Sequence, residues 1–134
     1  MADVTVRKVR PRHLSIMQIR LPLPGFVSIL HRVSGAGLFL CLPVLIALFG
    51  ASLGSPAEYA SLQNALAFSV LGLPLLKLLL LGLLWAYLHH FCAGIRFLLL
   101  DMHVGIELPQ ARASAVAVLG VSLGLTVILG VLSW

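Results

Sequence analysis

The chain has 134 residues, of which 60% are hydrophobic and only 10% are charged, and its formal net charge is +5. A soluble domain carries about 25% charged residues, and one this small cannot bury so much apolar surface. A disordered chain is also excluded, because such chains are polar.

The charges lie at the edges of long apolar segments. Only Glu58 and Lys77 are formally charged between residues 33 and 95, and no residue is charged between 113 and 134. A membrane helix needs about 20 largely apolar residues. We therefore expect an all-α integral membrane subunit built as a three-helix bundle. The expected spans are about residues 25–53, 62–100 and 109–134, preceded by a basic arm of residues 1–24.

Turn residues separate the first two spans. Ser55 is a candidate N-cap, with Pro56 at the first helical position and Glu58 three residues after the cap. This pattern predicts a short surface helix leading into the second span. Gly72 and Pro74 are expected to bend that span, because a proline cannot donate its helical hydrogen bond.

The distribution of Lys and Arg predicts the orientation. Five basic residues stand in the arm, and Arg96 and Arg112 flank the connection between the second and third spans. The connection between the first two spans has none. By the positive-inside rule the N-terminus is cytoplasmic and the C-terminus lies on the opposite side. We expect a multi-pass protein of the bacterial inner membrane, with a periplasmic C-terminus. The positive charge then serves topology and lipid contact, and no nucleic-acid partner is expected.

Two polar clusters stand inside the expected spans, where ionisable groups are functional candidates. The first cluster contains Ser28, His31, Arg32 and Gly35, and the second contains His89, His90, Gly94 and Arg96. The first helix crosses outward and the second returns, so both clusters fall at the same depth. We expect them to surround one pocket near the cytoplasmic face.

Haem would suit such a pocket, because its iron takes imidazole ligands and its propionates need cationic or donor partners. Steps of four residues from His90 meet Gly82, Ala86 and Gly94, a stripe small enough for a macrocycle to approach. The same steps from His89 meet bulky residues, so the pattern favours His90 as the ligand. The alternative is an ordinary small-residue helix contact. A second histidine ligand is expected from another chain.

A quinone is the second candidate ligand, since its carbonyl oxygens need donors in an apolar slot. Ser28 and Arg32, one helical turn apart, could supply them. The alternatives are a packing serine and an arginine whose side chain extends to the membrane surface.

Two motifs then resemble those of a known family. Residues 28–34, SILHRVS, are similar to the SxxHRx[ST] signature of the cytochrome b subunit of succinate dehydrogenase, and Arg10-Pro11 resembles the start of that signature. Residues 90–101, HFCAGIRFLLLD, resemble its second signature, HxxxGIR[HF]LxxD. The resemblance covers the chain from about Arg10 to its end.

The resemblance implies roles for individual residues. His90 would be an axial ligand of a b-type haem, and His31 with Arg32 would lie near the haem propionates. Ser28 and Arg32 would form part of a ubiquinone site, and Asp101 and Arg96 are candidates for supporting that site or a subunit contact.

The resemblance also implies partners. One haem b would be shared with a second hydrophobic anchor subunit, which supplies the other histidine. An iron–sulfur subunit and a flavoprotein subunit would carry succinate oxidation, while this chain contributes only electron transfer and quinone binding. The alternatives are the anchor of a menaquinone-linked fumarate reductase and a structural membrane scaffold without a cofactor.

Overall fold

The computed structural model describes residues 20–133. Most of the predicted basic arm, including the Arg10-Pro11 pair, and the C-terminal Trp134 lie outside the described residues. The described part is all-helical: α1 spans Leu23–Leu53, α2 Pro56–Ala67, α3 Leu75–Asp101 and α4 Leu108–Ser133. Over this range α1, α3 and α4 are the three helices long and apolar enough to cross a membrane, which confirms the predicted fold class.

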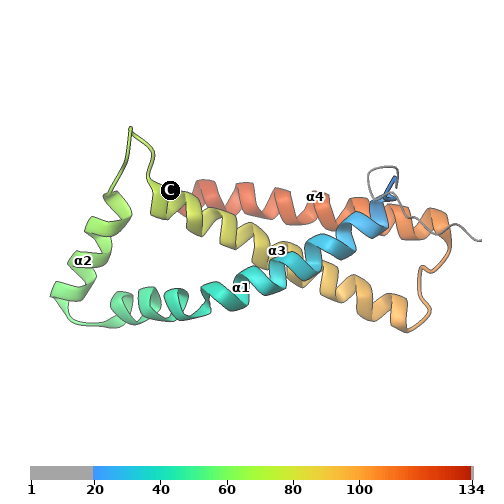
Figure 1. Cartoon of the computed structure of the whole chain (residues 1–134), viewed down its shortest axis with the longest axis horizontal. Coiled ribbons are helices and arrows are strands. Elements are labelled where there is room, and N and C mark those ends of the chain that lie inside the picture. Colours follow the sequence, from blue (N-terminus) through green and yellow to red (C-terminus); the bar gives the residue numbers. More distant parts are fainter. Residues whose placement is uncertain (1–19, 134) are drawn as a thin grey trace, which may run out of the picture.

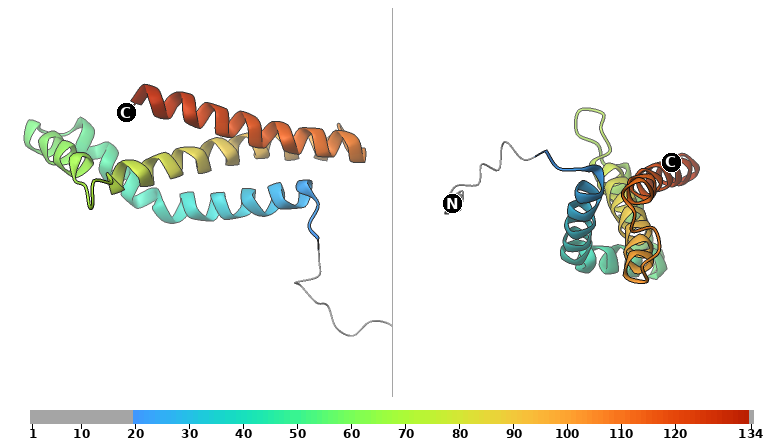
Figure 2. Two further views of the ribbon diagram at one scale, coloured as in Figure 1. Left: turned by 90° about the horizontal axis from the view of Figure 1, so that it is seen from above. Right: turned by 90° about the vertical axis from the view of Figure 1, so that its right-hand side faces the viewer.

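The helix α3 forms the middle of the bundle. It crosses between α1 and α4 and packs against both (Figures 1 and 2). The helices α1, α3 and α4 begin or end together at one end of the bundle, which we call the Arg20 end, and α2 lies across the opposite end. Contacts of α1 with α3, of α3 with α4 and of α1 with α4 thus hold the three long helices together.

The expected short surface helix is present. The Ser55 side chain accepts a hydrogen bond from the Glu58 backbone N–H, while the Glu58 carboxylate accepts from the Ser55 backbone N–H at 2.6 Å. With Pro56 at the first helical position, this capping box begins α2 as predicted.

The second span differs from the expected range of 62–100, because the chain breaks completely where a bend was expected. Leu71 and Gly72 have φ of 53° and 79°, and Val70 and Leu73 close a tight turn with two backbone hydrogen bonds. Left-handed residues cannot continue a right-handed helix, and Pro74 has no N–H to donate. The span therefore begins at Leu75, and residues 56–67 belong to a separate helix.

Buried side chains are few and lie mainly where the three spans cross. The apolar core consists of Val27 from α1, Ala93 from α3, and Ala115 and Val118 from α4. Most large apolar side chains point outward; Leu132, for example, is 79% exposed. Such an outward apolar surface is expected of a protein whose solvent is lipid.

Candidate functional site

One histidine from each polar cluster meets the other where α1 crosses α3. The imidazole rings of His31 and His90 stack with their centroids 4.1 Å apart and an interplanar angle of only 8°. The Phe97 ring also packs against His31, with 5.2 Å between the two ring centroids. The expectation that the two helices bring these histidines to one depth is therefore met, and the stack restrains both ring planes.

A backbone hydrogen bond orients His90. Its Nδ1 lies 3.0 Å from the carbonyl oxygen of His31, which can only accept a hydrogen bond. Nδ1 therefore donates in this contact, and in the neutral imidazole Nε2 is the nitrogen with the lone pair. A hydrogen bond of this kind is how proteins fix the tautomer and orientation of a metal-ligating histidine.

Ser34 completes the contact, although sequence reasoning assigned it no role. Its buried hydroxyl donates to the His31 carbonyl at 2.9 Å and lies 3.3 Å from His90 Nδ1. Ser34 stands three residues after His31, so it shares one helical face with it. The only sequence signal for it was its place at the last position of the first motif.

Gly35 allows the two helices to approach this closely. A Cβ atom at this position would lie 2.7 Å from Cε1 of His90, closer than packed carbon atoms come. Gly94 is less restrictive, since a Cβ there would meet His31 Nε2 at an ordinary 3.7 Å. A Cβ at Gly82, two turns before His90 on α3, would meet nothing within 4 Å. The helix contact around His90 is thus tight at Gly35 on α1, whereas the surface of α3 is open at Gly82.

The neighbouring histidine has a different environment. His89 is fully buried in the bundle interior, beside Trp85 at 5.6 Å between ring centroids. Neither of its ring nitrogens has a hydrogen-bond partner of normal geometry in the structure. One residue step rotates a side chain by 100° around a helix, so His89 and His90 cannot share a direction. The placement supports the choice of His90 over His89 as the candidate ligand.

Ser28 and Arg32 lie on α1 toward the Arg20 end. Ser28 is half-buried, and Arg32 is exposed. Between residues 20 and 133 neither side chain makes a hydrogen bond or an ion pair, so their donors are available to a group outside the chain.

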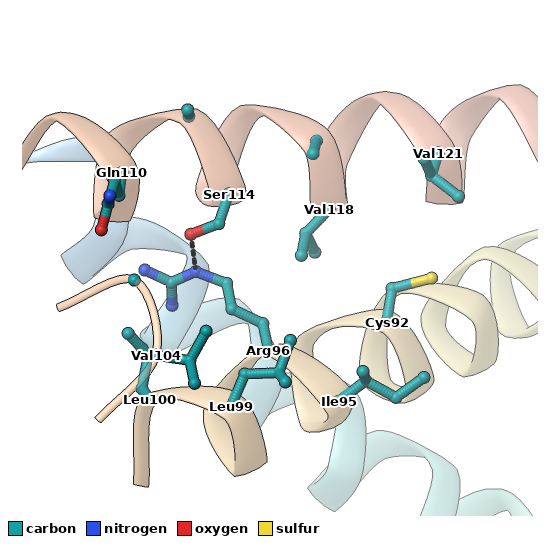
Figure 3. A pocket seen from close by; sticks show the side chains of 13 residues that line it. Cys92, Ile95, Arg96, Leu99, Leu100, Val104, Gln110, Ser114, Val118 and Val121 are labelled. Carbon is teal, nitrogen blue, oxygen red and sulfur yellow. Dashed lines mark hydrogen bonds between the residues drawn. The ribbon is translucent and has the colours of Figure 1, made fainter. Parts of the chain in front are cut away.

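Arg96 faces away from the histidine pair. Its Nε donates to Ser114 Oγ at 2.9 Å and its Nη2 donates to the Ala111 carbonyl at 3.1 Å (Figure 3). Six residues separate Arg96 from His90, which places them about 240° apart around α3. The structure thus joins Arg96 to α4, and Ser114 is a second functional side chain that sequence reasoning missed. Asp101 is exposed at the last position of α3.

Residues 20–133 contain no group of three or more His, Cys, Asp or Glu side chains that could hold a metal ion. A closed metal site within this part of the chain is therefore absent. Cys41 and Cys92 are free thiols.

Fold and site together define a class of protein: a helical membrane protein with three apolar spans and an oriented imidazole where two of them cross. The chain belongs to the family of succinate dehydrogenase/fumarate reductase transmembrane subunits, whose family model matches residues 6–129. The family predicted from the two motifs is confirmed.

Named relatives agree with this assignment. The chain is 34% identical to the succinate dehydrogenase cytochrome b556 subunit of Coxiella burnetii over 93% of its own length and 97% of the relative's. It is 33% identical to the b556 subunit of Paracoccus denitrificans over 96% and 94% of the two chains. It is 32% identical to the mitochondrial b560 subunit of Sus scrofa over 82% and 63%. The chain is therefore a cytochrome b-type membrane anchor subunit of a succinate dehydrogenase, an oxidoreductase complex.

Proposed function

We propose that this chain is the anchor of a succinate:ubiquinone oxidoreductase, that it shares one haem b with a second anchor subunit, and that it forms part of the ubiquinone site. The observation that carries the proposal is the bond between His90 Nδ1 and the His31 carbonyl, which leaves Nε2 free to bind iron. The relatives' names include cytochrome b, which agrees with a b-type haem.

The residues around His90 fit a haem in three respects. The imidazole is the donor type that haem iron takes. The stack on His31 restrains the plane of the ring, and glycine at position 35 leaves room for it. The backbone at Gly82 is open, so a flat macrocycle can lie against α3 there. When bound, the haem supplies a one-electron redox centre.

His90 would hold the haem iron from this chain, and a histidine of the second anchor subunit would provide the other ligand. The described chain holds no second imidazole positioned for that role, because His31 lies stacked on the face of His90 and His89 is buried. We assign His31 and Arg32 to the haem propionates, since His31 stacks on His90, and Arg32, its neighbour on α1, is a cation with no ion pair among residues 20–133.

Ser28 and Arg32 act on the quinone. The Ser28 hydroxyl and the Arg32 guanidinium donate hydrogen bonds to a quinone carbonyl oxygen, and the guanidinium stabilises negative charge that develops on that oxygen during reduction. Ubiquinone takes up two protons with two electrons, and the Arg20 end gives a short route from water. Asp101, exposed at that end, and Arg96 are assigned to supporting positions for this site or for a subunit contact.

The charge distribution supports a cytoplasmic Arg20 end and a periplasmic C-terminus. Arg20, Arg32 and Arg112 lie at or near the Arg20 end, whereas Glu58 lies in α2 at the opposite end. An iron–sulfur subunit, with the flavoprotein subunit behind it, would then dock on the cytoplasmic side of the bacterial inner membrane. Electrons and protons would meet at the same end of the bundle.

An optical and compositional experiment tests the proposal. The complex is purified from detergent-solubilised membranes through a tag on this chain, and its co-purifying chains and its dithionite-reduced minus oxidised spectrum are recorded. We expect a second anchor, an iron–sulfur subunit, a flavoprotein and b-type haem bands. A complex with those chains but without haem bands would support the scaffold alternative. The extracted quinone and the preferred electron acceptor separate succinate oxidation from the fumarate reductase alternative, which the relatives' names disfavour.

A further inference from the structure

A groove runs between α3 and α4 at the Arg20 end, on the side of α3 away from the histidine pair. Its volume is about 600 Å³, within the ~300–1,000 Å³ range of ligand sites. Its polar lining residues include Arg96, Gln110 and Ser114, and its apolar walls include Ala113, Ala117 and Val121. In Figure 3 the guanidinium and Gln110 lie at one end of the groove, and Cys92 and Val121 lie at the other. The groove is therefore polar at one end and apolar along its length.

The charge of Arg96 has no counterion in this part of the chain. Its side chain is only 5% exposed, yet its two hydrogen bonds go to neutral oxygens, those of Ser114 and Ala111. Among residues 20–133 no carboxylate forms an ion pair with it, although Asp101 and Glu107 lie nearby in sequence. A guanidinium has five N–H donors, so several remain after these two bonds. A buried cation with spare donors favours an anion from outside the chain.

Arg96 lies at the polar end of the groove, near the point where α3 ends and α4 begins. It stands five residues before the end of α3, about 7.5 Å along the axis. Gln110 lies in the first turn of α4, where the positive end of the helix dipole favours negative charge. From there the apolar walls extend about 12 Å between Ala113 and Val121 toward the bundle middle. An occupant needs an anionic head at Arg96 and an apolar tail.

We propose that this groove binds one anionic phospholipid, with its phosphate on Arg96 and Gln110 and an acyl chain along Ala113, Ala117 and Val121. The positive charge of Arg96 favours a phospholipid phosphate over a helix of the partner anchor. A partner helix would have to place a carboxylate at Arg96 to match the cation. A phospholipid carries its phosphate at headgroup depth and its acyl chain in the hydrocarbon, so one molecule matches both the cation and the apolar walls. The proposal rests on membrane insertion and uses neither His90 nor the donors of Ser28 and Arg32; Arg96 is the one residue that it shares with the quinone-site assignment.

Native mass spectrometry of the purified complex tests the site. Wild-type complex is delipidated by detergent exchange and then titrated with phosphatidylglycerol or phosphatidylcholine in mixed micelles. One arginine contact with an anionic lipid contributes about 1 kcal/mol, which is roughly fivefold in affinity. We expect one phosphatidylglycerol adduct with at least that preference over phosphatidylcholine. Equal binding of both lipids, or adduct formation with inorganic phosphate alone, would overturn the proposal.

Two pairs of variants separate the groove from the fold. Ala117→Phe fills the groove without touching the bonds of Arg96, and Val116→Phe is its matched control, because Val116 is 58% exposed on a different face of α4. Arg96→Gln removes the charge, while Arg96→Lys retains it. We expect Ala117→Phe to lose the adduct, Val116→Phe to keep it, and Arg96→Gln to lose the preference that Arg96→Lys largely retains.

The same preparations show whether the groove binds a lipid or a helix of the second anchor subunit. If Ala117→Phe prevents the second anchor subunit from co-purifying while phosphatidylglycerol binding is unchanged, the groove is a helix-docking surface and the lipid proposal is wrong. If Ala117→Phe leaves both assembly and the adduct unchanged, the lipid binds elsewhere and the proposal is again wrong. Because Ala117→Phe spares Arg96, a failure of Arg96→Gln to assemble does not remove the test.

Discussion

Replacement of Gly35 by alanine tests the close contact between α1 and His90. The added Cβ would lie 2.7 Å from Cε1 and 3.2 Å from Nδ1 of His90. The ring cannot move freely, because Nδ1 is bound to the His31 carbonyl and the ring face is stacked on His31. Either α1 moves away from α3, or the imidazole leaves its hydrogen bond.

The magnitude follows from two opposing effects. Overpacking a tight contact costs about 1–3 kcal/mol. Alanine is favoured over glycine inside a helix by about 1 kcal/mol. We therefore expect Gly35→Ala to destabilise the subunit by up to about 2 kcal/mol.

Gly37→Ala is the matched control. It lies two residues further along α1, and a Cβ there would meet nothing within 4 Å. This variant receives the helix-propensity gain without the clash, so it should be neutral or up to about 1 kcal/mol more stable. The two variants should differ by about the overpacking cost alone.

The assay is thermal denaturation of the purified complex, followed by intrinsic fluorescence and, on the same sample, the reduced minus oxidised haem spectrum. Gly35→Ala should melt below wild type and shift or weaken the haem bands, while Gly37→Ala should melt at or above the wild-type temperature and keep the wild-type haem bands. Indistinguishable melting curves and spectra for the two variants would refute the inference that Gly35 sets the position of His90.

Three further predictions follow from the site and the surface helix. His90→Ala should remove or alter the haem spectrum while His89→Ala largely keeps it, because only His90 has an oriented, free Nε2; the opposite pattern would reverse the ligand assignment. Arg32→Leu should depress ubiquinone reduction and leave succinate oxidation by a soluble artificial acceptor intact; equal loss of both would point to a role in assembly. Hydrogen bonds from the Ser55 backbone and hydroxyl hold the pKa of Glu58 below its ordinary 4.5. The capping contribution of this carboxylate is therefore present above pH 4.5 and is lost as the pH falls through the lower folded pKa. Hydrogen exchange of the α2 amides should accelerate over that pH range in the wild type, and Glu58→Ala should already exchange fast at pH 7; identical protection in both at pH 7 would contradict the capping role.

Two faces of α3 pack against different helices, so the variants on these faces have separate effects. One face carries His90 against α1, and another carries Arg96 against α4. A substitution at Arg96 can thus change lipid binding or helix packing without touching the haem ligand, whereas Gly35 acts on the ligand through α1. Measurements of haem content, quinone reduction and lipid binding on the same preparations therefore distinguish effects on the His90 face from effects on the Arg96 face.

Much of the fold was predictable because its cause is local. Runs of about 20 apolar residues must form helices in lipid, where every backbone group needs an internal partner. The capping box at Ser55 is likewise a short-range pattern. The start of α3 was not predicted correctly, since Leu71 is a non-glycine residue with positive φ, and nothing in its residue type announces a left-handed turn.

The sequence by itself determined the membrane class and the family, because span length and motif spacing are properties of the linear chain. Only the tertiary structure decided which of those residues share a site. Helical phase sends His90 toward α1, buries His89 in the core and turns Arg96 to α4. The one-dimensional pattern placed all three in one cluster, since depth is set by position along a helix, whereas direction depends on which neighbours pack against each face.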